Sequence, residues 1–288
     1  MGTDPSIASL LAPLGGDFGS TSASELALVG AACGAVGVWV VYFGRAFLAE
    51  SFGHALLPGL VVAAALGSSL VVGAIVGVIV AYGVLLLAQR APRTSDSSAT
   101  AVGVTLLVAI GALIASQGTG SARFESLLFG DPLAATWRDV AVAAAFALIV
   151  GLFLSGFHDR FAALAFDPQS ARTIGVNVGL TGALLIGVLA VAIATAATVA
   201  GSLLALALLT GPALGVIPLR MRLGATLLAA SVVGALTGVV GIYISYYANW
   251  PASASVALAA CAFAASGAAG GAWLAGRPPS ARGAAQAT

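Results

Sequence analysis

Long apolar runs separated by short polar breaks dominate the pattern of this chain. The stretches 60–87, 101–115 and 180–209 contain no charged residue. A helix of about 20 such residues crosses the hydrocarbon core of a bilayer, and backbone groups in lipid must be satisfied within the spanning element, which favours helices. The alternation that a membrane β-barrel requires is absent. The pattern therefore predicts an all-α, polytopic transmembrane bundle.

The polar breaks divide the chain into nine predicted spans, or eight if one Gly/Pro-rich segment is short or re-entrant. The expected spans cover residues 25–44, 46–66, 67–88, 101–116, 140–157, two helices within 178–218 that separate near Gly201, 223–247 and 252–274. Residues 1–24 then form an N-terminal external or interfacial segment, 25–275 the transmembrane domain and 276–288 a cytoplasmic C-terminal tail. No cleavable signal peptide is expected, because residues 1–24 lack a basic segment ahead of an apolar core.

The arginines predict the orientation of the chain. In the nine-span scheme Arg123 and Arg138 fall on one side of the membrane, and all the other arginines fall on the opposite side. Arginine is concentrated in cytoplasmic loops. The N-terminus of this multi-pass membrane protein is therefore expected outside and the C-terminus in the cytoplasm.

Composition narrows the function. The 288 residues are 60% hydrophobic and only 7% charged, whereas a soluble domain is about 25% charged. The chain has no lysine, and a phosphate-binding P-loop and a Schiff-base enzyme both require one. We therefore expect a transporter subunit rather than an enzyme, with ATP hydrolysis in a separate partner chain and no permanently bound cofactor. The net charge of +1 says nothing about nucleic acid, and no nucleic-acid partner is expected.

The glycines, the cysteines and one histidine can be explained without a functional site. The 37 glycines are explained either by close helix packing or by a GC-rich genome. Cys33 and Cys261 lie in apolar spans and are interpreted as small core residues rather than as redox or metal groups. His158 follows a predicted span and is interpreted as a solvated side chain at a cytoplasmic helix end.

Glu50 and His54 form the sharpest candidate site. Their spacing of four places both on one face of a helix, and ionisable residues in membrane spans commonly mark a pathway or site. A carboxylate beside an imidazole suits zinc, manganese or iron. The alternative is that Arg45 marks the membrane edge, so that Glu50 lies only about 7 Å inside it and pairs with that arginine.

Two further segments carry candidate contacts. Asp167 followed by Pro168 predicts an N-cap and a short helix over residues 168–174 that ends at Gly175. Such a helix in a cytoplasmic loop is either a docking element or an interfacial helix without a partner. The Leu127–Asp131 stretch, which includes Phe129 and Gly130, predicts a turn on the outer side.

Several of these segments together resemble one family. Residues 50–59, Glu-Ser-Phe-Gly-His-Ala-Leu-Leu-Pro-Gly, resemble the acidic-x-x-x-His-Ala-x-x-Pro-Gly motif of the metal-specific ABC permeases, which take up zinc, manganese or iron. Residues 166–176 resemble the cytoplasmic coupling segment of that family, and 128–131 match its external Leu-Phe-Gly-Asp. Residues 201–212 and 245–251 resemble two later family motifs. The matches occur in family order over residues 25–275.

The chain also departs from the family pattern at two places. The family usually has Asp where Glu50 stands, which keeps the charge but lengthens the side chain. Residues 210–215 lack the usual Pro-Ala-Ala-Thr-Ala pattern. Both departures loosen any inference about which metal is carried.

The resemblance implies an ABC importer permease that passes a divalent transition metal, zinc, manganese or iron, from an external metal-binding protein to the cytoplasm. It implies a homodimer in the lipid bilayer with cytoplasmic ABC ATPase subunits. Glu50 and His54 would transiently ligate the metal. The residues that would couple to the ATPase are Phe166, Asp167, Pro168, Ala171 and Gly175, and those at the external mouth are Phe129, Gly130 and Asp131.

Three alternatives remain at this point. A siderophore/cobalamin-type ABC permease shares the coupling element but lacks the acidic-His pair. An ATPase-independent secondary transporter is expected to show inverted repeats and more intramembrane ionisable groups. A membrane metalloprotease has too few ligands here, since the chain has two histidines.

Overall fold

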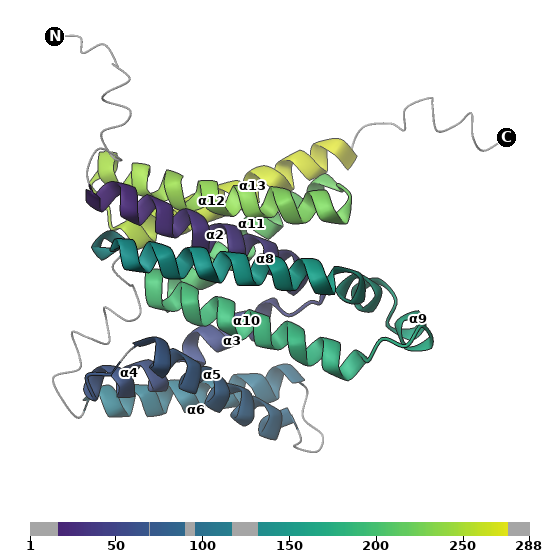
Figure 1. Cartoon of the computed structure of the whole chain (residues 1–288), viewed down its shortest axis with the longest axis horizontal. Coiled ribbons are helices and arrows are strands. Elements are labelled where there is room, and N and C mark those ends of the chain that lie inside the picture. Colours follow the sequence, from purple (N-terminus) through teal and green to yellow (C-terminus); the bar gives the residue numbers. More distant parts are fainter. Residues whose placement is uncertain (1–16, 69, 90–95, 117–131, 276–288) are drawn as a thin grey trace, which may run out of the picture.

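The computed structural model describes residues 17–68, 70–89, 96–116 and 132–275. All regular structure within these residues is helical, as Figure 1 shows. The elements are α2 (Asp17–Tyr42), α3 (Ala46–Ala55), α4 (Leu57–Ala65), α5 (Leu70–Gln89), α6 (Asp96–Ser116), η2 (Pro132–Ala134), α8 (Trp137–Phe166), α9 (Pro168–Thr173), α10 (Val178–Ala200), α11 (Ser202–Val216), η3 (Ile217–Leu219), α12 (Leu223–Ala248) and α13 (Ala252–Ala275). The all-α class predicted from the apolar runs is confirmed.

The helices run back and forth through one bundle. Within the described residues, six helical segments are long and apolar enough to cross a bilayer when α3 and α4 are taken as one, and three shorter apolar helices lie in α5, α6 and α11–η3. Together they correspond to the nine predicted spans. The predicted break at Gly201 is present, because this glycine separates α10 from α11 with a φ of 85°.

The two ends of the bundle differ in charge. The course of the helices in Figure 1 carries α2 from the end where α8 also begins to the opposite end, where α9 lies and α13 finishes. Of the arginines in the described segments, Arg138 alone belongs to the first end. The others are at the second end and are Arg45, Arg160, Arg172, Arg220 and Arg222. This distribution agrees with the predicted orientation.

Two helices differ from the predicted spans. The second span is interrupted at Leu56, where α3 ends and α4 begins. Pro58 lies in the first turn of α4 and has no N–H to continue the hydrogen-bond ladder of α3. The fifth span is longer than expected, because α8 starts at a capping box formed by Thr136 and Asp139 and continues through the polar residues after Phe157.

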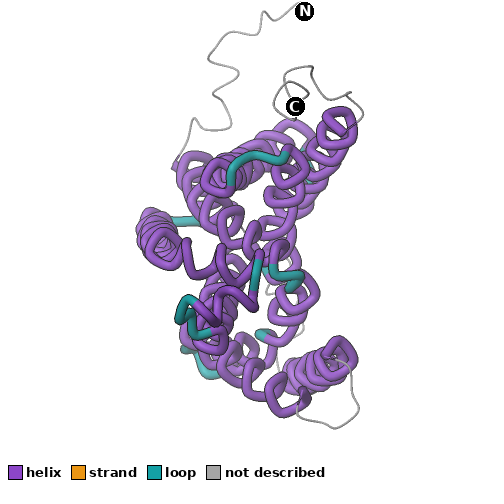
Figure 2. Tube along the Cα trace, turned by 90° about the vertical axis from the view of Figure 1, so that its right-hand side faces the viewer, coloured by secondary structure: helices purple, strands orange, loops and turns teal. Residues whose placement is uncertain are grey.

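The helices fall into two groups joined by α3 and α10. One group consists of α4, α5 and α6, and the other of α2, α11, α12 and α13. Both α3 and α10 contact members of each group, while α8 packs on α2 and α10. Figure 2, which looks along the helices, shows the elongated cross-section that results.

Glycine has different roles at different crossings. Gly30 and Gly34 of α2 lie against the backbone of α12, so closely that an added Cβ would clash with a carbonyl group. At Gly151 and Gly187, in contrast, an added Cβ would meet nothing within 4 Å. Close packing therefore explains the first pair of glycines, and nothing in the structure requires glycine at the second.

Candidate functional site

Helix α3 presents the predicted metal ligands on one face. Glu50 is exposed and His54 is partly buried, and neither side chain makes a hydrogen bond or an ion pair with any other described residue. The alternative pairing of Glu50 with Arg45 is therefore not formed. Both side chains lie in α3, before the break at Leu56.

A single chain offers few candidate metal ligands at this place. Glu50 and His54 are only two candidate ligands, and the described part of the chain contains no group of three or more His, Cys, Asp or Glu side chains able to hold a metal ion. Metal sites in proteins generally use more than two protein ligands or complete the shell with water and substrate groups. The exposed position of Glu50 leaves its carboxylate open to ligands from outside this chain.

The predicted loop helix is present as α9. Asp167 caps it by accepting hydrogen bonds from the backbone N–H groups of Gln169 (3.1 Å) and Ser170 (3.0 Å). Hydrogen bonding from Ser170, and then from Gln169, lowers the pKa of the Asp167 carboxyl below its usual range. The carboxylate therefore stays charged, and the cap stays intact, throughout the neutral pH range. Gly175 follows with a φ of 83°, which a side chain would strain.

Helix α9 projects from the end of the bundle (Figure 1). Its Ala171 side chain is buried, whereas Phe166 and Ile174 at its two ends are 64% and 71% exposed. Ring contact with Tyr42, at a centroid distance of 5.4 Å, fixes Phe166 to the end of α2. Helix α9 is thus flanked by two large, exposed apolar side chains, Phe166 at the end of α8 and Ile174 directly after α9.

The external residues Phe129, Gly130 and Asp131 lie outside the described residues. The cysteines are free; Cys33 is buried as expected, but Cys261 is exposed, because none of the described helices packs against this face of α13. His158 is half-buried rather than solvated, and its ring stands edge-on to Trp39 at 5.7 Å. This contact exists because α8 continues as a helix past Phe157.

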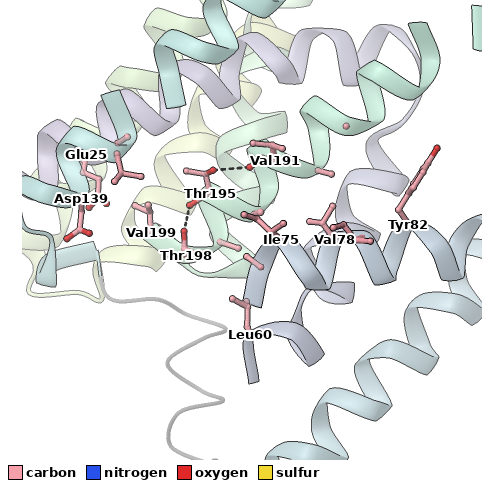
Figure 3. A pocket seen from close by; sticks show the side chains of 18 of the residues that line it. Glu25, Leu60, Ile75, Val78, Tyr82, Asp139, Val191, Thr195, Thr198 and Val199 are labelled. Atoms are coloured by element: carbon pink, nitrogen blue, oxygen red, sulfur yellow. Dashed lines mark hydrogen bonds between the residues drawn. The ribbon is translucent and has the colours of Figure 1, made fainter. Parts of the chain in front are cut away.

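A cavity of about 980 Å³ lies between α2, α5, α8 and α10. Its walls are mostly apolar, and it reaches the surface of the chain beside the exposed Ile79 and Val191. Figure 3 shows Glu25 of α2 and Asp139 of α8 side by side at one end of this cavity. Thr195 and Thr198 of α10 also line it.

Glu25 is the polar residue that the sequence analysis missed. It was placed at the start of the first span, but α2 begins at Asp17, two turns earlier, and Glu25 is only 4% exposed. The available signal was an acidic residue directly adjoining an apolar run, with small, weakly polar residues before it. Such a segment can extend a helix into the bilayer when its neighbours cover it.

Comparisons with known proteins agree with this architecture. The model of the ABC 3 transport family matches residues 21–269. The manganese transport system membrane protein MntC of Halalkalibacterium halodurans is 31% identical over 236 residues, which cover 81% of this chain and 80% of that protein. The manganese import system permease protein ScaB of Streptococcus gordonii is 28% identical, with 80% and 83% covered.

Two further matches extend the comparison. The chelated iron transport system membrane protein YfeC of Yersinia pestis is 26% identical, with 77% of this chain and 75% of that protein covered. The solved structure of PsaBC from Streptococcus pneumoniae in complex with Fab superposes with a TM-score of 0.83 at 25% identity, covering 91% of this chain and 95% of that one.

Fold and comparisons together define a helical membrane permease of the ABC importer type, which resides in the bacterial plasma (inner) membrane. The chain belongs to the ABC 3 transport family. This assignment favours the metal-permease interpretation over the siderophore/cobalamin-type permease and over a secondary transporter that needs no ATPase.

Proposed function

We propose that this chain carries a divalent transition metal, manganese, iron or zinc, into the cytoplasm by way of Glu50 and His54. The observation that carries the proposal is the face of α3, where a carboxylate and an imidazole lie one turn apart with no partner among the described residues. An unpaired carboxylate in a membrane helix is energetically costly, and residues of this kind commonly mark a substrate or ion pathway. The names of the relatives MntC, ScaB and YfeC, which refer to manganese or iron, support the same class of substrate.

The proposed metal path lies between two copies of the chain. Glu50 is exposed on the single chain, and one chain lacks enough ligands for a complete site. A second copy related by two-fold symmetry would contribute the same pair. Four weak ligands, completed by water, hold an ion long enough to pass it on without trapping it.

In the proposed importer, α9 couples the permease to ATP hydrolysis in its partner. Phe166, Asp167, Pro168, Ala171 and Gly175 form or support this helix, whose exposed apolar ends suit a groove on a cytoplasmic ABC ATPase. An external metal-binding protein would deliver the ion to the opposite end, near Phe129, Gly130 and Asp131. The absence of lysine from this chain is consistent with ATP hydrolysis in the partner.

The test is metal uptake by the complex of this permease, its ATPase and its binding protein in proteoliposomes. Manganese, iron(II) and zinc are compared, with magnesium as the control ion. We expect ATP-dependent accumulation of at least one of the three transition metals and none of it when the ATPase is omitted. Accumulation of none of them would contradict the proposed function.

A further inference from the structure

A buried carboxylate without a partner lies in the cavity at the end where α2 and α8 begin. Glu25 is 4% exposed and lines the cavity. It makes no hydrogen bond or ion pair with the other residues that the structure describes. The carboxylate faces the cavity without a neighbouring cation among these residues, and a charge held this far inside the protein is unfavourable unless it is offset, so a proton or a cation from outside the described chain must balance it.

Asp139 adds a second negative charge at the same place. Its negative charge repels a negative charge on Glu25, and Figure 3 shows the two side chains next to each other. One carboxylate oxygen of Asp139, Oδ2, accepts hydrogen bonds from the backbone N–H (2.9 Å) and the hydroxyl (2.6 Å) of Thr136. These bonds orient the carboxylate, while Oδ1 has no partner among the described residues.

No cation of the described chain neutralises this pair. Arg138 precedes Asp139 on α8 but makes no ion pair with either carboxylate within the described segments. The cavity, at about 980 Å³, has room for an ion that keeps several of its waters, since one water occupies about 30 Å³ of the liquid. Two carboxylates and water are oxygen ligands, which hard divalent cations prefer.

We propose that Glu25 and Asp139 bind a partly hydrated divalent cation, of the Mn²⁺, Mg²⁺ or Ca²⁺ class, at this end of the cavity. The two negative charges match the charge of the ion, and Asp139 is held in place by Thr136. The site is separate from Glu50 and His54, because it is built by α2 and α8 rather than by α3. The proposal that a cation binds here depends only on the geometry of these residues. The further statement that this site lies on the import route rests on the proposed function.

The experiment measures Mn²⁺ binding to the full-length chain in lipid nanodiscs, from the loss of the electron paramagnetic resonance signal of free hydrated Mn²⁺. The parent for these measurements carries Glu50→Gln and His54→Gln, which removes the other proposed ligands. We expect this parent to retain one bound Mn²⁺ per chain. Glu25→Gln should weaken binding by about tenfold or more, since loss of even supporting groups around a metal costs about 10–100-fold.

Matched variants separate binding from folding. Asp139→Asn keeps an acceptor for Thr136 and should also weaken Mn²⁺ binding. Asp159→Asn removes an exposed carboxylate from the other end of α8 and should leave binding unchanged. Glu25→Gln is close to isosteric, and an unchanged elution volume and unfolding temperature would show that the variant is folded.

Two results would overturn the proposal. One is that the parent binds no Mn²⁺ between pH 6 and pH 8.5, which means that protons rather than a metal neutralise the carboxylates. The other is that the Glu25→Gln/Asp139→Asn variant binds Mn²⁺ as well as the parent. A separate uptake assay on the complex, with Glu50 and His54 intact, tests whether the site lies on the import route. If Glu25→Gln abolishes Mn²⁺ binding at this site but leaves the uptake rate unchanged, the site is not on that route. Failure of all metal uptake with binding retained would contradict only the proposed function.

Discussion

Gly30 of α2 and Gly234 of α12 occupy each other's missing side-chain positions: a Cβ built on either one would collide with the carbonyl oxygen of the other. The contact is reciprocal and involves backbone on both sides, so neither helix can relieve it by moving a flexible side chain. Packing of this kind brings two membrane helices close enough for van der Waals contact along their backbones.

Alanine at Gly30 should therefore destabilise the bundle. We expect Gly30→Ala to force α2 and α12 apart at a cost of about 1–3 kcal/mol, as for other overpacked sites. The measurement is the unfolding temperature of the purified chain in detergent, followed by tryptophan fluorescence. Gly151→Ala is the control, because an added Cβ at Gly151 meets nothing within 4 Å. Equal unfolding temperatures for the two variants would contradict the close approach.

Replacement of the α3 ligands should stop transport and leave the complex assembled. We expect Glu50→Gln and His54→Gln each to reduce ATP-dependent metal uptake by about tenfold or more. Glu50→Asp keeps the charge and should retain more uptake than Glu50→Gln. Asp159→Asn, which alters an exposed carboxylate on α8, serves as the control for general effects. Normal uptake by the Glu50→Gln/His54→Gln double variant would remove these residues from the path.

The cap of α9 should affect binding of the ATPase. Asp167→Ala removes the acceptor for the N–H groups of Gln169 and Ser170, so we expect the loop helix to fray and copurification of the ATPase to fall. Asp167→Asn retains an acceptor suited to an N-cap and should copurify nearly as well as the parent. If Asn behaves like Ala, the charge rather than the cap is what matters.

The same cap predicts how docking depends on pH. The folded-state pKa of Asp167 is lowered, so its stabilising effect is present above the ordinary carboxyl pKa and is lost only as the pH falls through the lowered value. Copurification of the ATPase should therefore not change between pH 6 and pH 8 through this group. A fall in copurification of the ATPase between pH 6 and pH 8 that is absent in the Asp167→Asn variant would contradict a lowered pKa of Asp167.

The orientation can be tested with cysteines. In a Cys33→Ala/Cys261→Ala background, a cysteine at Trp137 should react with a membrane-impermeant maleimide added to intact cells, because Trp137 is exposed at the start of α8. A cysteine at Asp159, near the other end of the same helix, should react only after the cells are opened. The reverse result would invert the predicted topology.

Local signals explain what the sequence predicted well. The break at Gly201 and the α9 cap at Asp167 each depend on a few neighbouring residues. The spans followed from hydropathy alone, because lipid requires long apolar helices.

Properties that depend on distant residues were not predictable in this way. Burial of Glu25 requires that α2 start before the apolar run and that α8 and α10 pack around it. Exposure of Glu50 follows from which face of α3 meets its neighbours. Likewise, the sequence could not show which glycines, such as Gly30 rather than Gly151, lie at a close crossing.

The position of α3 has a mechanical consequence. This ten-residue helix touches both the α4–α5–α6 group and α11 of the other group, and Pro58 weakens its continuation into α4. A rotation of one group relative to the other must therefore be accommodated at α3 and at α10, the two helices that join the groups. Because Glu50 and His54 lie on α3, a small rotation of either group would, in the proposed dimer, change the distance between the two proposed ligand pairs and with it their affinity for the ion.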